Sequence, residues 1–286
     1  MKFSHLLFSL ILLSHIELFS QSTDTFSVPT SSKENASLEI AVRIPFGYTK
    51  DTSDKFGIMV LFGGRNWEAK RTIETYKFDG LADRRKLFLL SLSFKDDEYW
   101  QPEKWSGKAL QDALDKILVK YGLDRKKKLF YYGYSAGAQC VNLFLAWKPE
   151  IVEAWALHAC GVWLDPDKNR ELKVPGLATC GELDSERCEI SMFTIAKMRE
   201  NGCPVIWKSY PEEDHGLPGM ALKLAEAFFE SAISSSGRQV KFVGDDQMEK
   251  YFPADSKDAS YIDEAYRNEF CDEKTAQLWA AREKGR

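Results

Sequence analysis

Short, strongly apolar runs recur along the middle of the chain. They lie at 58–62, 87–90, 129–132, 155–157, 174–179 and 205–207. Strands that are buried on both faces of a sheet are apolar in this way, rather than at every second position. One further segment, 38–44, does place an apolar residue at every second position, which is typical of an edge or half-buried strand. The pattern predicts a sheet made mostly of buried strands.

Between these runs, apolar residues recur every three or four positions. Such a stripe is typical of a helix that packs one face on a core. The stripes lie at 110–121, 138–147, 190–198 and 217–228. Strands that alternate with helices predict an α/β fold with a doubly wound, mostly parallel sheet, and ligands of such sheets bind beyond the carboxyl ends of the strands.

The 286 residues are enough for one large domain or two small ones, and the chain has no internal repeat or low-complexity stretch. Residues 23–35 are rich in Ser, Thr and charge, which indicates a flexible mature N-terminus. The main domain is expected to span 23–237. The charged and aromatic tail at 238–286, with a weak helical pattern at 275–284, is expected to be a C-terminal extension packed on the same domain.

Residues 1–22 have the organisation of a secretory signal peptide. Lys2 supplies a positive charge, 6–13 form an apolar core, and Ser20-Gln21-Ser22 places small residues at the spacing that a signal peptidase prefers. The apolar run is too short to span a bilayer, so we expect a secreted or periplasmic protein with no stable membrane anchor. An uncleaved anchor or a wrongly assigned start is the alternative.

Composition and charge narrow the function classes. Hydrophobic residues make up 44% of the chain and charged residues 29%, which is enough apolar material for a sizeable core. The formal net charge of -4 argues against a nucleic-acid partner. A basic cluster at 125–128 precedes an apolar run and is expected to be a solvated loop.

All of the cysteines come after the predicted signal peptide. If the protein is exported, an oxidising environment would permit disulfides between them. They are Cys140, Cys160, Cys180, Cys188, Cys203 and Cys271. Cys140, Cys160 and Cys180 lie in apolar surroundings and are expected to be buried thiols, whereas a bridge between Cys180 and Cys188 is left open. No paired CxxC spacing occurs, so we expect no structural zinc site. No cofactor is expected.

The segment Gly133-Tyr134-Ser135-Ala136-Gly137 lies between an apolar run and a helical stripe. A serine between two near glycines, at a turn from strand to helix, can be held with its hydroxyl exposed. The glycines suit a tight, strained turn, because a Cβ at either position would crowd the strand and the helix. This placement predicts that Ser135 is a nucleophile and that the protein is a hydrolase.

A serine nucleophile needs a general base, which is commonly a histidine. His5 and His15 belong to the predicted signal peptide, which leaves His158 and His215. His215 follows the last apolar run, in a loop before a helical stripe, and is predicted to be the base. His158 ends another run and is expected to be a buried, hydrogen-bonded histidine, with a place in the cleft wall as the alternative.

The imidazole in turn needs a carboxylate that fixes its tautomer. This acid should follow the strand between the serine and the histidine, where residues 181–184 lie. We predict Asp184 and keep Glu182 as the alternative. Asp165 follows an earlier run and Asp214 adjoins the histidine, so both are weaker candidates.

Acyl transfer also needs backbone N–H groups that stabilise the oxyanion. Gly63 and Gly64 follow the apolar run 58–62 and would let such groups approach a carbonyl oxygen. One donor is predicted to be Gly64 or Arg65, and the other is Ala136, the residue after the nucleophile. An ordinary tight turn is the alternative for the two glycines.

The order serine, acid, histidine resembles that of the α/β-hydrolase superfamily, over about 38–234. Gly-x-Ser-Ala-Gly at 133–137 and Gly-x-x-Asp at 181–184 resemble the group of polyhydroxybutyrate depolymerases, feruloyl esterases and dienelactone hydrolases. The resemblance implies a secreted serine esterase that works through an acyl-enzyme. Dienelactone hydrolases use cysteine where this chain has Ser135, and Phe62-Gly63-Gly64-Arg65 stands in place of the His-Gly-Gly-Gly motif of some lipases.

No long insertion separates the strands after the nucleophile, so we expect an open cleft without a large lid. Aromatic residues expected in loops around the cleft are Trp67, Tyr99, Trp100, Trp105 and Trp163. Trp67, Trp100 and Trp163 are the candidate substrate-binding residues, and packing beneath loops is the alternative. The expected partner is a small-molecule or polymeric ester, such as a polysaccharide-linked acetyl or feruloyl ester. A prolyl-oligopeptidase-like peptidase and a non-catalytic binding protein on the same fold stay open.

Overall fold

The computed structural model describes residues 22–31, 36–95, 98–165, 172–234 and 239–282. The predicted signal peptide lies outside these ranges except for its last residue. Within the described ranges, no helix is both long enough and apolar enough to cross a membrane.

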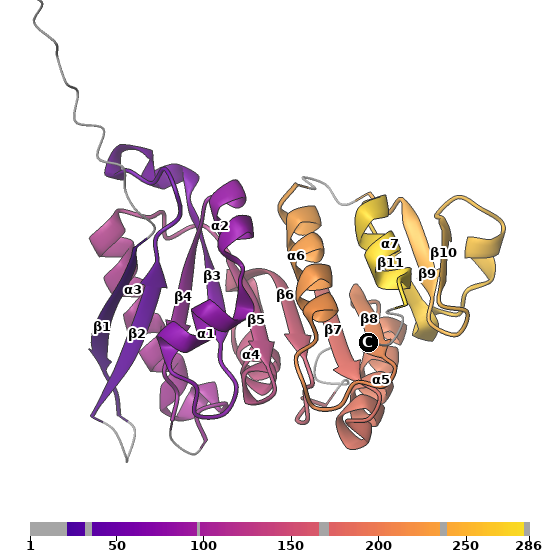
Figure 1. Ribbon diagram of the computed structural model, residues 1–286, viewed down its shortest axis with the longest axis horizontal. Helices are drawn as coiled ribbons and strands as arrows, with labels where there is room; N and C mark the ends of the chain where they lie inside the picture. Colours follow the sequence, from indigo (N-terminus) through magenta and orange to yellow (C-terminus); the bar gives the residue numbers. More distant parts are fainter. Residues whose placement is uncertain (1–21, 32–35, 96–97, 166–171, 235–238, 283–286) are drawn as a thin grey trace, which may run out of the picture.

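An eight-stranded sheet forms the centre of the molecule (Figure 1), in the order β1-β2-β4-β3-β5-β6-β7-β8. Its strands are β1 (Thr23–Pro29), β2 (Ser37–Arg43), β3 (Gly57–Phe62), β4 (Leu87–Leu92), β5 (Leu129–Tyr134), β6 (Val152–His158), β7 (Gly176–Gly181) and β8 (Val205–Tyr210). β2 runs antiparallel to both of its neighbours, whereas the other adjacent strands pair in parallel. The predicted α/β fold with a mostly parallel sheet is confirmed.

Each predicted apolar run overlaps a strand of this sheet. In β3, Ile58, Val60 and Phe62 belong to the core on one face. Met59 and Leu61 belong to the core on the other face. Successive side chains of a strand point to opposite faces, so a strand that is apolar throughout contributes to both cores.

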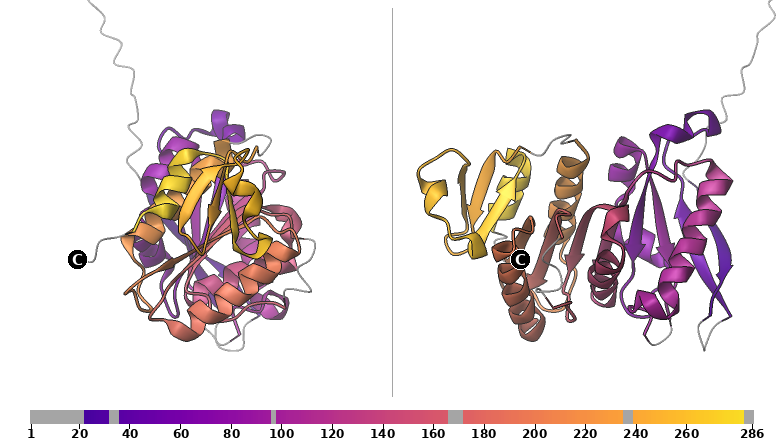
Figure 2. Two further views of the ribbon diagram at one scale, coloured as in Figure 1. Left: turned by 90° about the vertical axis from the view of Figure 1, so that its right-hand side faces the viewer. Right: turned by 180° about the vertical axis from the view of Figure 1, so that it is seen from behind.

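Helices cover both faces of the sheet (Figure 1 and Figure 2). One face carries α1 (Ala69–Tyr76), α2 (Asp79–Arg85) and α6 (Gly219–Ser234), and the other carries α3 (Gly107–Tyr121), α4 (Ala136–Trp147) and α5 (Ser185–Glu200). Short helical turns lie at Lys50–Lys55, Pro102–Ser106, Pro149–Ile151, Asp258–Tyr261 and Glu264–Tyr266. The four predicted helices correspond to α3, α4, α5 and α6, and their placement confirms the doubly wound arrangement.

The composition of residues 23–35 predicts a flexible N-terminus, but this is wrong for residues 23–29, which form β1 at the edge of the sheet, while 32–35 lie outside the described residues. β1 pairs antiparallel with β2, and Phe26 lies opposite Ile40. The ammonium group of Lys116 on α3 lies 4.8 Å from the centre of the Phe26 ring. An edge strand leaves most of its side chains exposed, so its polar composition resembles that of a loop.

The chain after α6 forms a small antiparallel sheet beside β8 (Figure 1). Its strands are β9 (Phe242–Asp245), β10 (Lys250–Pro253) and β11 (Arg267–Phe270), in the order β10-β9-β11, and α7 (Glu273–Ala280) follows. α7 packs against α6 and places Trp279 in the core. The carboxylate of Asp272 caps the start of α7 by accepting a hydrogen bond from the backbone N–H of Thr275.

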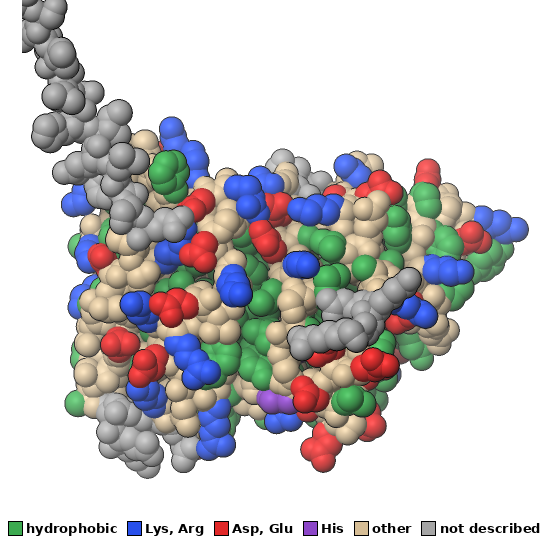
Figure 3. All heavy atoms as spheres, viewed as in Figure 1, with side chains coloured by type: hydrophobic (Ala, Val, Ile, Leu, Met, Phe, Trp, Pro, Cys, Tyr) green, Lys and Arg blue, Asp and Glu red, His purple; other side chains and the backbone are tan. Residues whose placement is uncertain are grey.

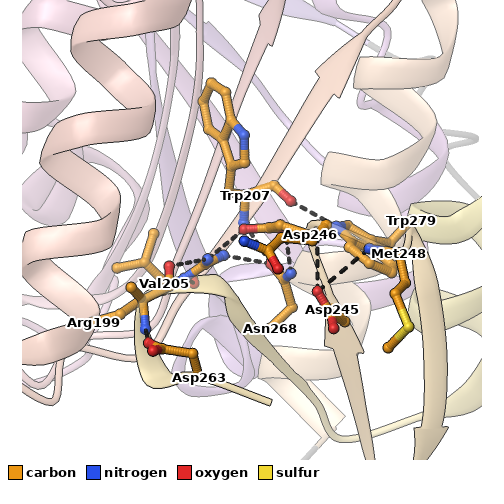
Figure 4. Close-up of polar contacts among 11 residues, drawn as sticks. Arg199, Val205, Trp207, Asp245, Asp246, Met248, Asp263, Asn268 and Trp279 are labelled. Atoms are coloured by element: carbon orange, nitrogen blue, oxygen red, sulfur yellow. Dashed lines mark hydrogen bonds and ion pairs between the residues drawn. The ribbon is translucent and has the colours of Figure 1, made fainter.

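Buried polar side chains join this extension to the edge of the main sheet (Figure 4). Arg199 of α5 donates a hydrogen bond to Asn268 Oδ1 at 2.6 Å and forms an ion pair with Asp246 at 2.5 Å. Asn268 Oδ1 also accepts from the backbone N–H of Trp207 at 2.7 Å, and the indole of Trp279 donates to the carbonyl oxygen of Trp207 at 2.6 Å. Side chains therefore occupy backbone groups of β8 that a further strand could otherwise pair with.

The surface carries charges of both signs. Basic and acidic side chains are interspersed over the face shown in Figure 3. The basic cluster at 125–128 lies in the turn before β5 and is largely exposed, as predicted. Arg125 forms an ion pair with Asp115 at 2.6 Å. This cluster is therefore part of an ordinary mixed surface.

Candidate active site

Ser135 occupies a sharp turn between β5 and α4. Its backbone has φ 56° and ψ -119°, a conformation that residues with a side chain rarely adopt. A Cβ at Gly133 would lie 2.2 Å from the carbonyl oxygen of Gly137, and a Cβ at Gly137 would lie 2.0 Å from that of Phe62. Both glycines are needed because α4 begins directly against the ends of β5 and β3.

Ser135, His215 and Asp184 form one hydrogen-bonded chain beyond the carboxyl ends of β5, β8 and β7. Ser135 Oγ lies 2.8 Å from His215 Nε2, and His215 Nδ1 lies 2.6 Å from Asp184 Oδ2. A carboxylate only accepts hydrogen bonds, so Nδ1 carries the ring proton and Nε2 can accept the proton of the serine hydroxyl. This arrangement can activate a serine by general-base catalysis.

Asp184 lies at the start of α5, where its side chain is 9% exposed. One carboxylate oxygen faces His215, and the other accepts a hydrogen bond from Arg187 at 3.0 Å. Sequence reasoning missed Arg187, although its position one helical turn after Asp184 could have indicated the contact. Both oxygens of the Asp184 carboxylate are thus held in place.

The other candidate acids have different partners. Glu182 accepts a hydrogen bond from the hydroxyl of Ser209 at 2.8 Å. Asp214 accepts one from the backbone N–H of Gly216 at 2.8 Å. Asp165 is exposed in the segment after β6. Among the described residues, Asp184 is the candidate acid that contacts the histidine.

Two aromatic side chains hold the loop that carries His215. The hydroxyl of Tyr134 donates a hydrogen bond to the carbonyl oxygen of His215, and their ring centres lie 5.4 Å apart. His158 Nε2 donates to the carbonyl oxygen of Gly216 at 2.9 Å, while its Nδ1 accepts from the hydroxyl of Thr179 at 2.7 Å. The loop that carries His215 is therefore held from two neighbouring strands, β5 and β6.

His158 is fully buried at the end of β6. Burial lowers its pKa to about 4, so the ring is neutral near neutral pH, with its proton on Nε2 toward the Gly216 carbonyl. The predicted buried, hydrogen-bonded histidine is confirmed. Its hydrogen bond to the Gly216 carbonyl oxygen also holds the backbone next to His215.

The candidate oxyanion-hole residues lie where β3 and β5 end. In the turn after β3, Gly64 is buried and Arg65 is exposed. Ala136 is the first residue of α4, where backbone N–H groups have no acceptor within the helix. A Cβ at Gly137 would lie 2.7 Å from the carbonyl oxygen of Gly63, so the start of α4 packs directly on this turn. The candidate donors thus lie on two adjoining segments.

Tyr76 joins these two segments from the end of α1. Its hydroxyl donates a hydrogen bond to the carbonyl oxygen of Phe62 at 2.6 Å and accepts one from the backbone N–H of Tyr134 at 3.2 Å. The side chain is fully buried. Sequence reasoning missed this residue because α1 is short and its buried face includes Thr72, which weakens the apolar stripe.

The aromatic loop residues fall into two groups. Trp67, Trp100 and Trp163 are partly buried, and the ring of Trp67 lies 5.6 Å from that of Tyr134, next to Ser135 in the chain. Tyr99 and Trp105 are buried instead and pack against Phe94. The expectation of a cleft without a large lid concerns the segment between β6 and β7. There, the described residues 159–165 and 172–175 form no helix.

All six cysteines are reduced, and each is buried except Cys271, which is partly buried. The predicted burial of Cys140, Cys160 and Cys180 is confirmed. Cys180 and Cys188, for which a bridge was left open, are both reduced. A hydrogen bond from the Cys180 thiol favours the thiolate of Cys188 and lowers its pKa.

Comparison with known proteins links this geometry to a fold family. No protein-family model matches the sequence, and no curated protein matches it. A ferulic acid esterase superposes with a TM-score of 0.60 at 13% identity, over 75% of this chain and 97% of that one. An S-formylglutathione hydrolase from Staphylococcus aureus gives 0.55 at 15% identity, over 75% of this chain and 96% of its own.

A thermostable esterase gives a TM-score of 0.58 at 18% identity, and the match covers 74% of this chain but 61% of the esterase. At these identities, the shared feature is the architecture of the sheet and its covering helices. The strand order, the turn at Ser135 and these structural neighbours together establish that the chain has the α/β-hydrolase fold.

Proposed function

We propose that the protein is a serine hydrolase that cleaves carboxylic esters through an acyl-enzyme intermediate. The observation that carries this proposal is the hydrogen-bonded chain from Ser135 through His215 to Asp184. Each member comes from the end of a different parallel strand, which is where ligands of such sheets bind. The strained turn at Ser135 and the hydrogen bonds that hold the His215 loop support the same proposal.

In the first half-reaction, Ser135 Oγ attacks the ester carbonyl carbon while His215 Nε2 accepts the hydroxyl proton. Asp184 stabilises the imidazolium that forms. The bond from the carbonyl carbon to the alcohol oxygen then breaks, and the imidazolium gives its proton to that oxygen. In the second half-reaction, His215 removes a proton from water, the resulting hydroxide attacks the acyl carbon, and Ser135 regains its proton as the carboxylic acid leaves.

Negative charge develops on the carbonyl oxygen in both halves. We assign its stabilisation to the backbone N–H of Ala136 and to that of Gly64 or Arg65, which lie on the adjoining segments after β5 and β3. One such donor contributes about 2.7–4 kcal/mol to transition-state stabilisation in other hydrolases. Its effect is large because the donors are oriented before the charge appears.

For the substrate, we propose esters carried on an extracellular polysaccharide, such as acetyl or feruloyl groups. Three observations support this choice. Trp67 contacts Tyr134 beside the nucleophile, and aromatic faces stack on sugars and phenolic rings. Residues 1–22 indicate export. One of the structural neighbours is a ferulic acid esterase.

The first experiment measures hydrolysis of p-nitrophenyl acetate by the purified protein. We expect turnover in the wild type and none above background in Ser135→Ala. Ser260→Ala is the matched control, because Ser260 is exposed in the C-terminal extension. Equal turnover by Ser135→Ala and the wild type would contradict the assignment of the nucleophile.

A second experiment tests the substrate class. Release of acetate or ferulate from substituted xylan is compared with hydrolysis of short p-nitrophenyl esters and of matching peptide amides. Preference for the polysaccharide esters supports the proposal. Indifference to the polysaccharide contradicts the substrate, and faster cleavage of the amides would show a peptidase instead.

A further inference from the structure

A cavity of about 190 Å³ lies between α5, β8 and the C-terminal extension. Its apolar wall is formed by Met192, Ile195, Trp207, Tyr266 and Trp279. Figure 4 shows the two tryptophans of this wall beside the polar network that joins the extension to β8. Aromatic walls with a few polar groups are typical of sites for small ligands.

Lys208 of β8 brings a positive charge to this cavity. Its side chain is 4% exposed, and its nearest acidic partner is Glu249 Oε1, at 3.8 Å from Nζ. Within the part of the chain that the structure describes, Nζ forms no hydrogen bond. The ring centre of Trp279 lies 5.8 Å from Nζ, so the ammonium group also faces the aromatic wall. A buried ammonium group is costly unless it is hydrogen-bonded and paired.

The other charges around Lys208 have closer partners. Arg199 pairs with Asp246 at 2.5 Å. Glu249 pairs more closely with Arg282 than with the lysine. The third nearby carboxylate, that of Glu182, accepts a hydrogen bond from Ser209. The ion pair of Lys208 is therefore longer than that of Arg199, the other cation that lines the cavity.

The surroundings of Lys208 also disfavour its charged form. Burial lowers the pKa of its ammonium group, and the attraction of Glu249 only partly offsets this effect. An anion that enters the cavity would supply the missing counter-charge and hydrogen-bond acceptors. Because Glu249 and Asp246 also line the cavity, a group with a single negative charge suits it better than a doubly charged phosphate.

We propose that this cavity binds a small aromatic carboxylate, at a site separate from Ser135. The carboxylate accepts hydrogen bonds from Nζ of Lys208, and the ring packs against the apolar wall of the cavity. The apolar wall selects the aromatic body, and the lysine selects the acid over its neutral amide. The site is independent of the proposed esterase chemistry.

Isothermal titration calorimetry with phenylacetate tests the proposal on the full chain. We expect one binding event per chain in the wild type. Lys208→Met keeps the length of the side chain but removes the charge, and it is expected to weaken binding by about tenfold or more. Phenylacetamide, the neutral analogue, should bind the wild type with a similar loss. Lys197→Met is the matched control on the neighbouring α5, where the lysine is 47% exposed, and it should bind as the wild type does.

Two further variants separate this site from the active site and from a folding defect. Ala196→Trp fills the cavity from α5 and should abolish binding while hydrolysis of p-nitrophenyl acetate continues. Ser135→Ala should bind phenylacetate as the wild type does. Absence of binding to the wild type, equal affinity in Lys208→Met, or loss of binding in Ser135→Ala would each overturn the proposal.

Discussion

Backbone geometry and side-chain contacts act together at Ser135. The residue contacts His215 from a backbone with φ 56°, and Gly133 and Gly137 leave the space that this turn requires. The histidine is fixed in turn by Asp184 on its ring and by Tyr134 on its backbone. Substitutions at single residues can therefore separate turn geometry from proton transfer.

Gly137→Ala is expected to lower the free energy of unfolding by about 3 kcal/mol. The added Cβ would lie 2.0 Å from the carbonyl oxygen of Phe62, and both atoms belong to packed backbone. Urea denaturation measures the loss. Gly219→Ala is the control, because no atom lies within 4 Å of a Cβ there. A loss of equal size in both variants would show that the close contact does not matter.

Asp184→Asn is expected to lower kcat by about 10³–10⁴-fold, because an amide no longer fixes the tautomer or stabilises the imidazolium. Glu182→Gln is the control and should keep nearly full activity, since Glu182 contacts Ser209 rather than the histidine. Steady-state hydrolysis of p-nitrophenyl acetate measures both. The reverse outcome would make Glu182 the acid.

His158 gives the fold a specific pH dependence. Burial lowers its pKa from 6.5 to about 4, so between these values the unfolded chain binds a proton that the folded chain does not. The stability from this residue is therefore complete above about pH 6.5 and decreases as the pH falls toward about 4. The full effect is about 3 kcal/mol.

His158→Gln tests this dependence, because glutamine offers an N–H donor toward Gly216 but does not titrate. The free energy of unfolding is measured in urea for both proteins at about pH 7 and about pH 4.5. We expect the wild type to lose about 2–3 kcal/mol more than the variant over this interval. Equal losses would mean that His158 does not carry the dependence.

At the scale of elements, the burial of the side chains determined which strands and helices could be predicted from the sequence. β3 and β7 are buried on both faces, so each appears as an apolar run. β1 exposes most of its side chains, and its two apolar residues, Phe26 and Val28, make an alternation too short to stand out from a loop. α1 buries Thr72 together with Ile73, so its stripe is mixed. Elements at an edge or with a mixed buried face therefore resembled loops.

The choice between Asp184 and Glu182 also depended on a contact that the sequence does not show. Both residues follow β7. The backbone N–H of Leu183 donates a hydrogen bond to the carbonyl oxygen of Glu213 at 2.9 Å, which joins the turn after β7 to the loop after β8. The turn places Asp184 at the start of α5, facing the histidine. Residue order alone could only limit the carboxylate partner of His215 to this segment.

Asn268→Ala is expected to lower the free energy of unfolding by about 2–3 kcal/mol. Asn268 Oδ1 accepts hydrogen bonds from the backbone N–H of Trp207 and from the guanidinium of Arg199, and alanine would leave both donors buried without this acceptor. Urea denaturation measures the change. Gln277→Ala, at an exposed position of α7, is the control, and an equally small effect in both would contradict the role of the network.

At the scale of the whole molecule, topology brings together residues that are far apart in the chain. Ser135 and His215 are 80 positions apart, and His215 and Asp184 are 31 apart. They meet because β5, β7 and β8 run parallel, so that their carboxyl ends lie on the same side of the sheet. The sequence could predict this meeting because strand and helix patterns define the order of the elements.

The cavity at Lys208 could not be predicted from the sequence in this way. It is formed by α5, β8 and the C-terminal extension, and no motif marks these segments as neighbours. The extension also provides Asn268 and Trp279, whose side chains occupy backbone groups at the edge of β8. Contacts of this kind depend on how separate segments pack, which a pattern along one segment does not encode.

The central claim is that Ser135 is an activated nucleophile, and covalent labelling with a fluorophosphonate probe tests it most directly. Intact-protein mass spectrometry followed by peptide mapping should show one adduct, located on Ser135. The adduct should be absent from Ser135→Ala and should form much more slowly in His215→Ala. No labelling of the wild type, or an adduct on another residue that persists in Ser135→Ala, would contradict the account.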